Sequence, residues 1–244
     1  MKAPEKIPDG MQDQFTMNGD MALVHQYIDQ ASEEVQEEIS DKYNSKVFFE
    51  MVEKATLKEV SYYYDTDKYL YAALDNFIEA GDLKAEDLRA LVIGSVQPWY
   101  EAILFSYGLR DITITEYSDR PDFIDELHYT HPDKLEGEFD IIISISSHEH
   151  CGLGRYGDPL DPSGDIKAVD ELRNFVTDTG RLFLAVPVGK DSLVWNAHRI
   201  YGRNRLPLLF GEWALSRTFG FDEQLLDVYR GTDGSYQPVF VLKN

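Results

Sequence analysis

The stretch FDIIISISSHEHCGLGRYGDPLDPSGD, residues 139–165, decides the fold. Its first part, residues 139–145, is a short and continuous apolar run, which is typical of a strand buried on both faces of a parallel sheet. The segment that follows, residues 146–165, is polar and rich in glycine and proline, and long segments of this kind inside compact domains tend to carry function. We therefore expect a binding loop at the carboxyl end of a buried strand, which is the edge where open α/β sheets bind ligands.

Strand and helix patterns alternate on both sides of this stretch. Short apolar runs predict strands at 90–93, 112–116, 127–130 and 181–188, and amphipathic segments predict helices at 99–107 and 166–176, the second ended by Gly180. Two final segments, 225–229 and 238–242, flank a turn signal at 230–234 and predict an antiparallel hairpin at the sheet edge. The pattern as a whole predicts an α/β fold with a Rossmann-like, doubly wound sheet.

The first third of the chain has a different pattern. Residues 1–20 hold prolines and glycines without periodicity and predict a flexible tail. Apolar residues at helical spacing predict helices at 21–40, 48–55 and 70–78. The sequence therefore predicts three parts, which are a tail at 1–20, a helical N-terminal cap at 21–88 and an α/β domain at 89–244.

The chain is strongly acidic. Its 244 residues include 44 Asp and Glu against 23 Lys and Arg, which gives a net charge of −21. Such a surface repels nucleic acid phosphates and anionic lipids, so we expect no nucleic acid and no membrane as a partner. No apolar stretch is long enough for a signal peptide or a membrane span, and Cys151 is the one cysteine, so no intrachain disulfide is expected. We expect a cytoplasmic location, and the oligomeric state is left open.

Several side chains in and after the loop are candidates for proton transfer. His150 directly follows the buried strand and its turn, where an imidazole can act as a general base or orient a hydroxyl group. The alternative is a histidine that is hydrogen-bonded within the loop. If His150 is not the base, the next candidates are Asp158, Tyr156 and His198.

One basic segment, residues 195–205, interrupts the acidic chain. Its Arg199, Arg203 and Arg205, together with Arg155 in the loop, can hold a phosphate or carboxylate through forked hydrogen bonds, which predicts an anionic or sugar-like small-molecule acceptor. The alternative is that these arginines pair with nearby acids. No metal is expected, because neighbouring residues of an extended segment alternate in direction and at most His148 and His150 could share one ion.

The segments ALVIGS, FDIIISISSHEH and LRNFVTDTGRLFLAVP resemble the class I S-adenosyl-L-methionine-dependent methyltransferases, over about residues 90–242. The resemblance implies S-adenosyl-L-methionine as cofactor, with Glu116 at the end of the second strand accepting hydrogen bonds from the ribose hydroxyls. Where that family has G-x-G-x-G, this chain has Gly94-Ser95-Val96-Gln97-Pro98. The other cofactor contacts that it implies are Gly94, Ser95, Pro98, Trp99, Tyr117, Ser146 and Ser147.

The segment SSHEHCGLGRYGDPLDPSGD, with GSVQPWYEA before it and PVGKDSLVWNAHRIYGRNRLP after it, is also similar to a methyltransferase-like domain family of unknown function. Together the resemblances imply transfer of a methyl group to an oxygen of a small polar acceptor, such as a sugar or sugar phosphate. The alternative is a non-catalytic member of the fold that binds a nucleotide or sugar. A nicotinamide oxidoreductase is less favoured, since the G-x-G-x-x-G fingerprint is missing.

Overall fold

The computed structural model describes residues 3–30, 43–61, 63–79, 81–117 and 123–244. Within them, a seven-stranded sheet has the order β4-β3-β2-β5-β6-β10-β9. The pairs from β4 to β6 are parallel, and β10 runs antiparallel to both of its neighbours. The strands are β2 (Arg89–Ile93), β3 (Asp111–Thr115), β4 (Leu127–Thr130), β5 (Phe139–Ile145), β6 (Val176–Ala185), β9 (Ala214–Phe219) and β10 (Val239–Lys243).

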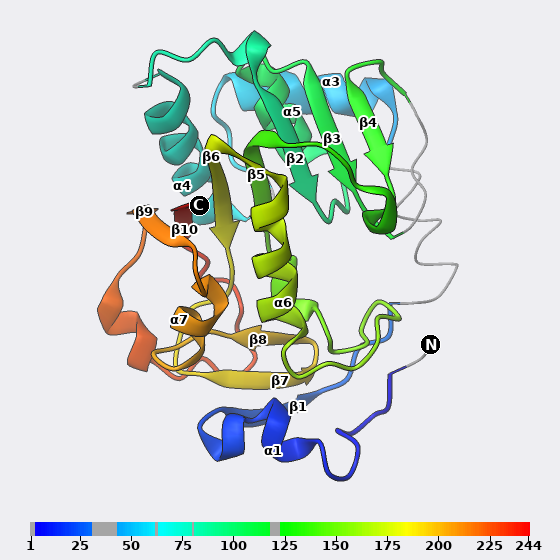
Figure 1. Ribbon diagram of the computed structural model, residues 1–244, viewed down its shortest axis with the longest axis vertical. Helices are drawn as coiled ribbons and strands as arrows, with labels where there is room; N and C mark the ends of the chain where they lie inside the picture. The colour runs from blue at the N-terminus through cyan, green and yellow to red at the C-terminus, as the bar shows by residue number, and fades with distance from the viewer. Residues whose placement is uncertain (1–2, 31–42, 62, 80, 118–122) are drawn as a thin grey trace.

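Helices cover both faces of this sheet, because its central strands are apolar on both sides. In β2, Ala90 and Val92 belong to one buried cluster and Leu91 belongs to another on the opposite face. Figure 1 shows α6 in front of the sheet and α3 and α5 behind it. The expected α/β fold with a Rossmann-like, doubly wound sheet and an antiparallel edge is confirmed. The helices are α3 (Ser45–Thr56), α4 (Tyr64–Leu74), α5 (Trp99–Ser106), α6 (Gly164–Glu171) and α7 (Arg205–Phe210).

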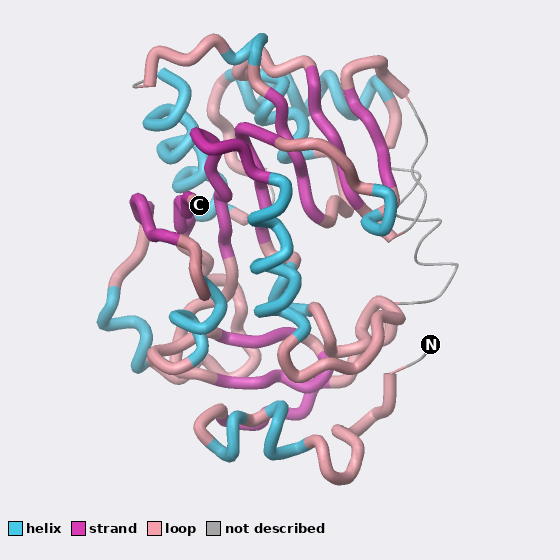
Figure 2. Tube along the Cα trace, in the orientation of Figure 1, coloured by secondary structure: helices cyan, strands magenta, loops and turns pink. Residues whose placement is uncertain are grey.

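A second, three-stranded sheet lies beside the main one and was not expected. It consists of β1 (Ala22–Gln26), β7 (Ser192–Asn196) and β8 (His198–Ile200), with β1 parallel to β7. Figure 2 shows it below the main sheet, running across the direction of the main strands. The helix expected at 21–40 is therefore wrong over Ala22–Gln26, where pairing with β7 outweighs the helical spacing; residues 31–40 of that helix lie outside the described residues.

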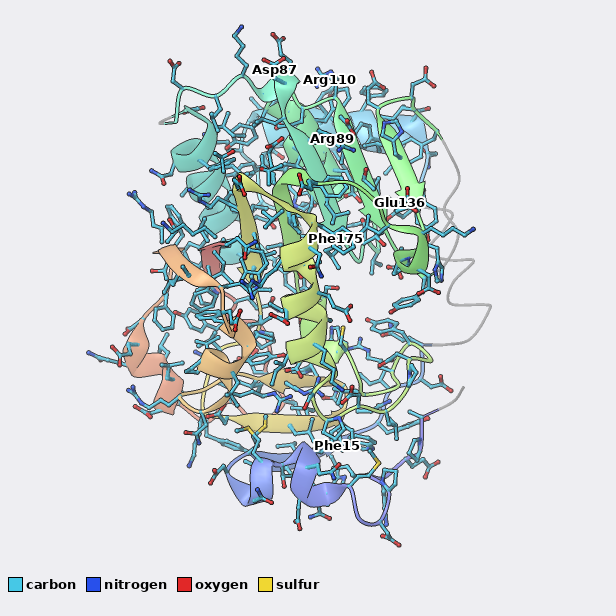
Figure 3. The ribbon with its side chains drawn as sticks, in the orientation of Figure 1. Phe15, Asp87, Arg89, Arg110, Glu136 and Phe175 are labelled. Carbon is cyan, nitrogen blue, oxygen red and sulfur yellow. The ribbon has the colours of Figure 1, made fainter. Side chains whose placement is uncertain are left out.

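The first residues dock against this second sheet. Phe15, in the short helix α1 (Gln12–Phe15), is labelled in Figure 3 and is fully buried. Its ring meets that of Trp195 edge-on, with 5.1 Å between the ring centroids. Trp195 Nε1 also donates a hydrogen bond to Pro4 O at 3.2 Å. A large aromatic side chain thus contacts these residues at two points. The division into a tail at 1–20 and a cap stays a prediction. The boundary at residue 88 stays a prediction.

Two expected element boundaries are wrong. The strand β6 begins at Val176, so Gly180 lies inside the strand and does not end the preceding helix. The segment Glu223–Asp227 is a 3₁₀ helix and not the expected strand of the edge hairpin. At the sheet edge, β10 pairs antiparallel with β9 instead. The strand β9 escaped prediction because it lies at the sheet edge, where its mostly exposed residues need no apolar alternation.

A buried ionic cluster joins α6, β8 and α7. The Asp165 carboxylate has no exposed surface and accepts hydrogen bonds from Arg205 Nη2 at 2.6 Å and Tyr201 Oη at 2.9 Å. Arg199 Nε lies 3.7 Å from the same carboxylate. Burial alone would raise the pKa of Asp165, but the two arginines lower it below its ordinary value. The carboxylate is therefore ionised and fully partnered.

We expect Asp165→Asn to destabilise the fold strongly. The change leaves two arginines in the interior without their counter-charge, which costs about 3–5 kcal/mol in the free energy of unfolding. Urea unfolding measures it, with Glu223→Gln as the control, since Glu223 forms an exposed pair with Arg203 that is worth at most about 1 kcal/mol. Equal losses in the two variants would contradict a structural role for Asp165.

Candidate functional site

A cavity of about 570 Å³ lies at the carboxyl ends of β2 and β5. These neighbouring strands mark the point where the strand order reverses, from β2-β3-β4 on one side to β5-β6 on the other. Ligands bind at this position in open α/β sheets, and the volume is within the usual range of about 300–1,000 Å³. The lining residues are Gln30, Tyr63, Gly94, Ser95, Val96, Gln97, Trp99, Tyr100, Ile145, Ser146, Glu149, His150, Arg155, Tyr156, Pro187, His198, Gly234, Ser235 and Gln237.

The turn after β2 requires a glycine at its first position. Gly94 has φ +66°, and a Cβ atom there would lie 2.6 Å from Ser147 Oγ. Gly94 N donates to Thr115 O, and Tyr43 Oη donates to Ser95 O at 2.6 Å, so the turn is fixed on both sides. Its backbone therefore reaches the cavity in one defined conformation.

A polar network forms one wall of the cavity, centred on Ser146. This residue directly follows β5 and has φ +52°, a conformation that a residue other than glycine holds only when its surroundings require it. Its Oγ donates to Glu149 Oε1 at 2.6 Å and accepts from Tyr63 Oη at 3.0 Å and Gln237 Nε2 at 3.1 Å. Glu149 and Gln237 were not predicted as site residues, and the sequence around Gln237 contains no signal that could have identified it.

The Glu149 side chain is buried at this wall, with 1% of its surface exposed. Its Oε2 atom has no hydrogen-bond partner among the described residues. Burial raises the pKa of Glu149 to about 7, against the opposite effects of the Ser146 hydrogen bond and of the Arg155 and Arg199 charges. The carboxyl group therefore changes its charge near neutral pH.

Two neutral imidazoles line the cavity: His150 lies next to Glu149, and the His198 ring lies 6.5 Å from the His150 ring. His150 Nδ1 is 2.6 Å from Ala197 O, which can only accept, so Nδ1 carries the proton and Nε2 is free to accept one. Burial and the Arg155 charge lower the pKa of His150 well below 6.5, and burial lowers that of His198 to about 4. His150 can serve as a base, but its own titration does not fall in the usual histidine range.

Arg155 brings a positive charge to the cavity. Its Nε donates to Gln30 Oε1 at 2.6 Å and its Nη1 donates to Ala197 O at 2.9 Å, and both acceptors are neutral. Within the described part of the chain, no acidic side chain lies within ion-pair distance of its guanidinium group. The Tyr156 ring lies 5.2 Å from the Arg155 Cζ atom. A guanidinium group without a carboxylate partner is suited to an anionic ligand.

Four expected site residues have structural roles instead. Asp158 Oδ2 accepts from the backbone amides of Gly152 and Gly154, so it shapes the loop and does not line the cavity. Arg199 and Arg205 are buried against Asp165, and Arg203 pairs on the surface with Glu223 and Asp227. The expectation that these three arginines hold an acceptor is corrected, because nearby acids already neutralise them.

The expected cofactor residues divide into two groups. Glu116 follows β3 and is half-buried, and its Oε1 accepts from Tyr117 N at 2.8 Å. The Tyr117 side chain is 66% exposed and lies beside the His131 ring. Trp99 is fully buried and donates from Nε1 to Asp67. The cavity lining includes Gly94, Ser95, Trp99 and Ser146 and does not include Pro98, Glu116, Tyr117 and Ser147.

Among the described residues, no group of three or more His, Cys, Asp or Glu side chains is arranged to hold a metal ion. No helix in this part of the chain has both the length and the apolar character needed to cross a membrane.

Gly94→Ala is expected to destabilise the protein more than Gly231→Ala. Both glycines have positive φ, so either alanine carries a backbone strain of about 1–3 kcal/mol. Only at Gly94 does the added Cβ also meet another residue, whereas nothing lies within 4 Å at Gly231. Thermal unfolding of the two variants measures the difference. Equal melting temperatures would show that the contact with Ser147 relaxes freely.

Three solved structures of methyltransferases are similar to this chain. The 1,6-didemethyltoxoflavin-N1-methyltransferase of Burkholderia thailandensis is 12% identical, with a TM-score of 0.48 over 76% of this chain and 91% of that one. The N-methyltransferase NodS of Bradyrhizobium japonicum, in complex with S-adenosyl-L-homocysteine, is 10% identical, with a TM-score of 0.46 over 81% and 98%. A putative S-adenosylmethionine-dependent methyltransferase of Streptococcus mutans is 13% identical, with a TM-score of 0.44 over 74% of this chain and 49% of its own length.

No curated protein sequence matches the chain. A family model does, and its description is Caenorhabditis protein of unknown function, DUF268. The match covers residues 87–227, which include β2, β5, the polar loop and the basic segment. Since this is more than half of the chain, the protein belongs to the DUF268 family.

Proposed function

We propose that this protein is an S-adenosyl-L-methionine-dependent methyltransferase that acts on a small polar acceptor. The observation that carries the proposal is the cavity at the reversal of strand order, with the Gly94 turn on one side and the polar loop on the other. A doubly wound sheet offers this position to a nucleotide-like cofactor. The polar loop adds groups that can receive a proton, which a simple binding site does not need.

The residues around the cavity fit the cofactor. The backbone of Gly94–Gln97 can hold its amino acid end, and Glu116 follows the neighbouring strand β3, where a carboxylate can accept two hydrogen bonds from a ribose diol. Gln237 Oε1 and His198 Nε2 are buried without a partner, and polar ligand groups would satisfy them. When bound, the cofactor supplies an electrophilic methyl group.

Arg155 and the neighbouring histidines favour an oxygen acceptor that carries an anionic group, such as a sugar phosphate. The guanidinium group can bind the phosphate or carboxylate, and the unprotonated Nε2 of His150 can orient a hydroxyl group. Holding the hydroxyl in line with the methyl group provides much of the rate enhancement, because two bound and oriented groups react without a bimolecular encounter. A cytoplasmic location stays a prediction.

The turn after β2 favours a second candidate, a non-catalytic member of the fold that binds a nucleotide or sugar. It holds one glycine and then Pro98, so fewer backbone amides can approach a ligand closely. Binding of S-adenosylmethionine distinguishes the two candidates, since only the enzyme requires it.

Calorimetric titration of the full chain is expected to show binding of both S-adenosylmethionine and S-adenosylhomocysteine. Glu116→Gln should weaken binding of S-adenosylhomocysteine by about 1–3 kcal/mol, the range for a hydrogen bond to a charged group. Glu136→Gln, at an exposed loop position, is the matched control and should bind as the parent does. If neither ligand binds, the enzyme proposal is rejected. An unchanged affinity of Glu116→Gln for S-adenosylhomocysteine would remove Glu116 from the site.

Sulfate is a probe for the anionic group of the acceptor. We expect sulfate to bind the parent protein and Arg203→Gln equally, because Arg203 is already paired on the surface. Arg155→Gln should lose most of this binding, because the substitution removes the positive charge and the paired N–H donors of the guanidinium group. The measurement is a sulfate titration followed by heat or by thermal stability. Equal binding in all three proteins would contradict the role of Arg155.

A further inference from the structure

The starting observation is a buried carboxylate oxygen that lines the cavity and has no partner. Glu149 is 1% exposed, its Oε1 accepts from Ser146, and its Oε2 meets no donor among the described side chains and backbone groups. Leaving a charged oxygen without a hydrogen bond in the interior costs several kcal/mol. Either a proton or a ligand must therefore satisfy Oε2.

Asp165 shows how this chain treats a carboxylate with a structural role. It is equally buried, yet two arginines and one tyrosine satisfy its oxygens. Arg199 also lies close to Glu149, but it donates to the main-chain oxygen of Glu149 and not to the side chain. His150 Nε2, 3.5 Å from Glu149 Oε1, carries no proton when Nδ1 donates to Ala197 O. Glu149 is thus held in place without being neutralised.

We propose that ionised Glu149 faces the positively charged sulfur of bound S-adenosylmethionine and then receives the acceptor's proton on Oε2. This inference rests on the proposed function. In the transfer, a bond forms from the acceptor oxygen to the methyl carbon, and the carbon–sulfur bond breaks with its electron pair left on sulfur. The proton of the acceptor hydroxyl moves to Glu149 Oε2.

Charge balance is the physical reason for this assignment. Before transfer, the cavity holds one positive sulfur and one negative carboxylate. After transfer, both are neutral, so the net charge of the cavity does not change. An uncompensated charge is costly in such a buried site, because the surrounding medium screens it weakly. If the bound cofactor already keeps Glu149 ionised, the cavity contains no uncompensated charge before or after the transfer.

The groups that face Glu149 set the pH at which it responds. Burial raises its pKa to about 7, while the Arg155 and Arg199 charges and the Ser146 hydrogen bond act against burial. The neighbouring Cys151 and Tyr201 stay neutral, since burial raises their pKa values, and His148 stays neutral because burial lowers its own. Further polar neighbours are His150, whose Nε2 lies 3.5 Å from Glu149 Oε1, and Tyr63 and Gln237, which are linked through Ser146. A cationic ligand therefore lowers the pKa of Glu149, and a neutral ligand does not.

The test compares S-adenosylmethionine with S-adenosylhomocysteine, which lacks the positive charge. Calorimetric titrations of the full chain, in two buffers of different ionisation enthalpy, count the protons exchanged on binding. Below the Glu149 pKa of about 7, we expect release of close to one more proton with S-adenosylmethionine than with S-adenosylhomocysteine. The affinity ratio of the two ligands should then rise about tenfold per pH unit up to that pKa.

Glu149→Gln keeps the oxygen that accepts from Ser146 but cannot ionise. It should bind both ligands with no difference in proton release and a ratio independent of pH. Glu223→Gln, an exposed carboxyl outside the cavity, is the matched control and should behave as the parent does. Ser146→Ala removes a contact that lowers the pKa of Glu149, so it should move the onset of proton release to higher pH.

The outcomes separate the inference from the proposed function. If both ligands bind the parent protein with equal proton exchange, or if Glu149→Gln keeps the difference, the role of Glu149 is wrong and the cofactor assignment stands. If neither ligand binds, the proposed function and the inference fail together. The comparison in the parent protein decides the question even if Glu149→Gln does not fold.

Discussion

The buried pair of Arg199 and Asp165 is the interaction on which the site depends. Arg199 Nη1 donates to Cys151 O at 2.6 Å and to Glu149 O at 3.4 Å, so one side chain fixes the backbone that follows β5. Asp165 at the start of α6 supplies the counter-charge that allows a guanidinium group to remain in the interior. The fold thereby uses an ion pair to hold the backbone at the start of this loop.

Two arginines that contact the same loop have opposite roles, because a carboxylate balances the charge of only one of them. Arg199 has its charge balanced by Asp165 and acts on the backbone. Arg155 contacts two neutral oxygens and keeps its charge available in the cavity. Between them, Glu149 is influenced by both charges and paired with neither. This arrangement gives the cavity a carboxyl group that responds to the charge of a ligand.

The sequence predicts those parts of the fold that depend on local pattern. The apolar runs of β2 and β5 and the long polar loop were sufficient to place a cavity at this sheet edge. The pattern could not separate Arg155 from Arg199, because their roles follow from partners distant in the chain. It also missed Glu149, whose Ser146 partner is held by side chains 83 and 91 residues away in sequence. The strand β1 was missed because pairing with β7, far along the chain, overrides its local helical spacing.

A crystal structure of the full chain grown with S-adenosylhomocysteine tests the central claim most directly. We expect ligand density in the cavity, with the amino acid end against the Gly94 turn, the ribose hydroxyls within hydrogen-bonding distance of Glu116, and the sulfur on the side of Glu149. Ligand bound at any other place, or a cavity without ligand at a saturating concentration, would contradict the claim that this sheet edge is a methyl-transfer site.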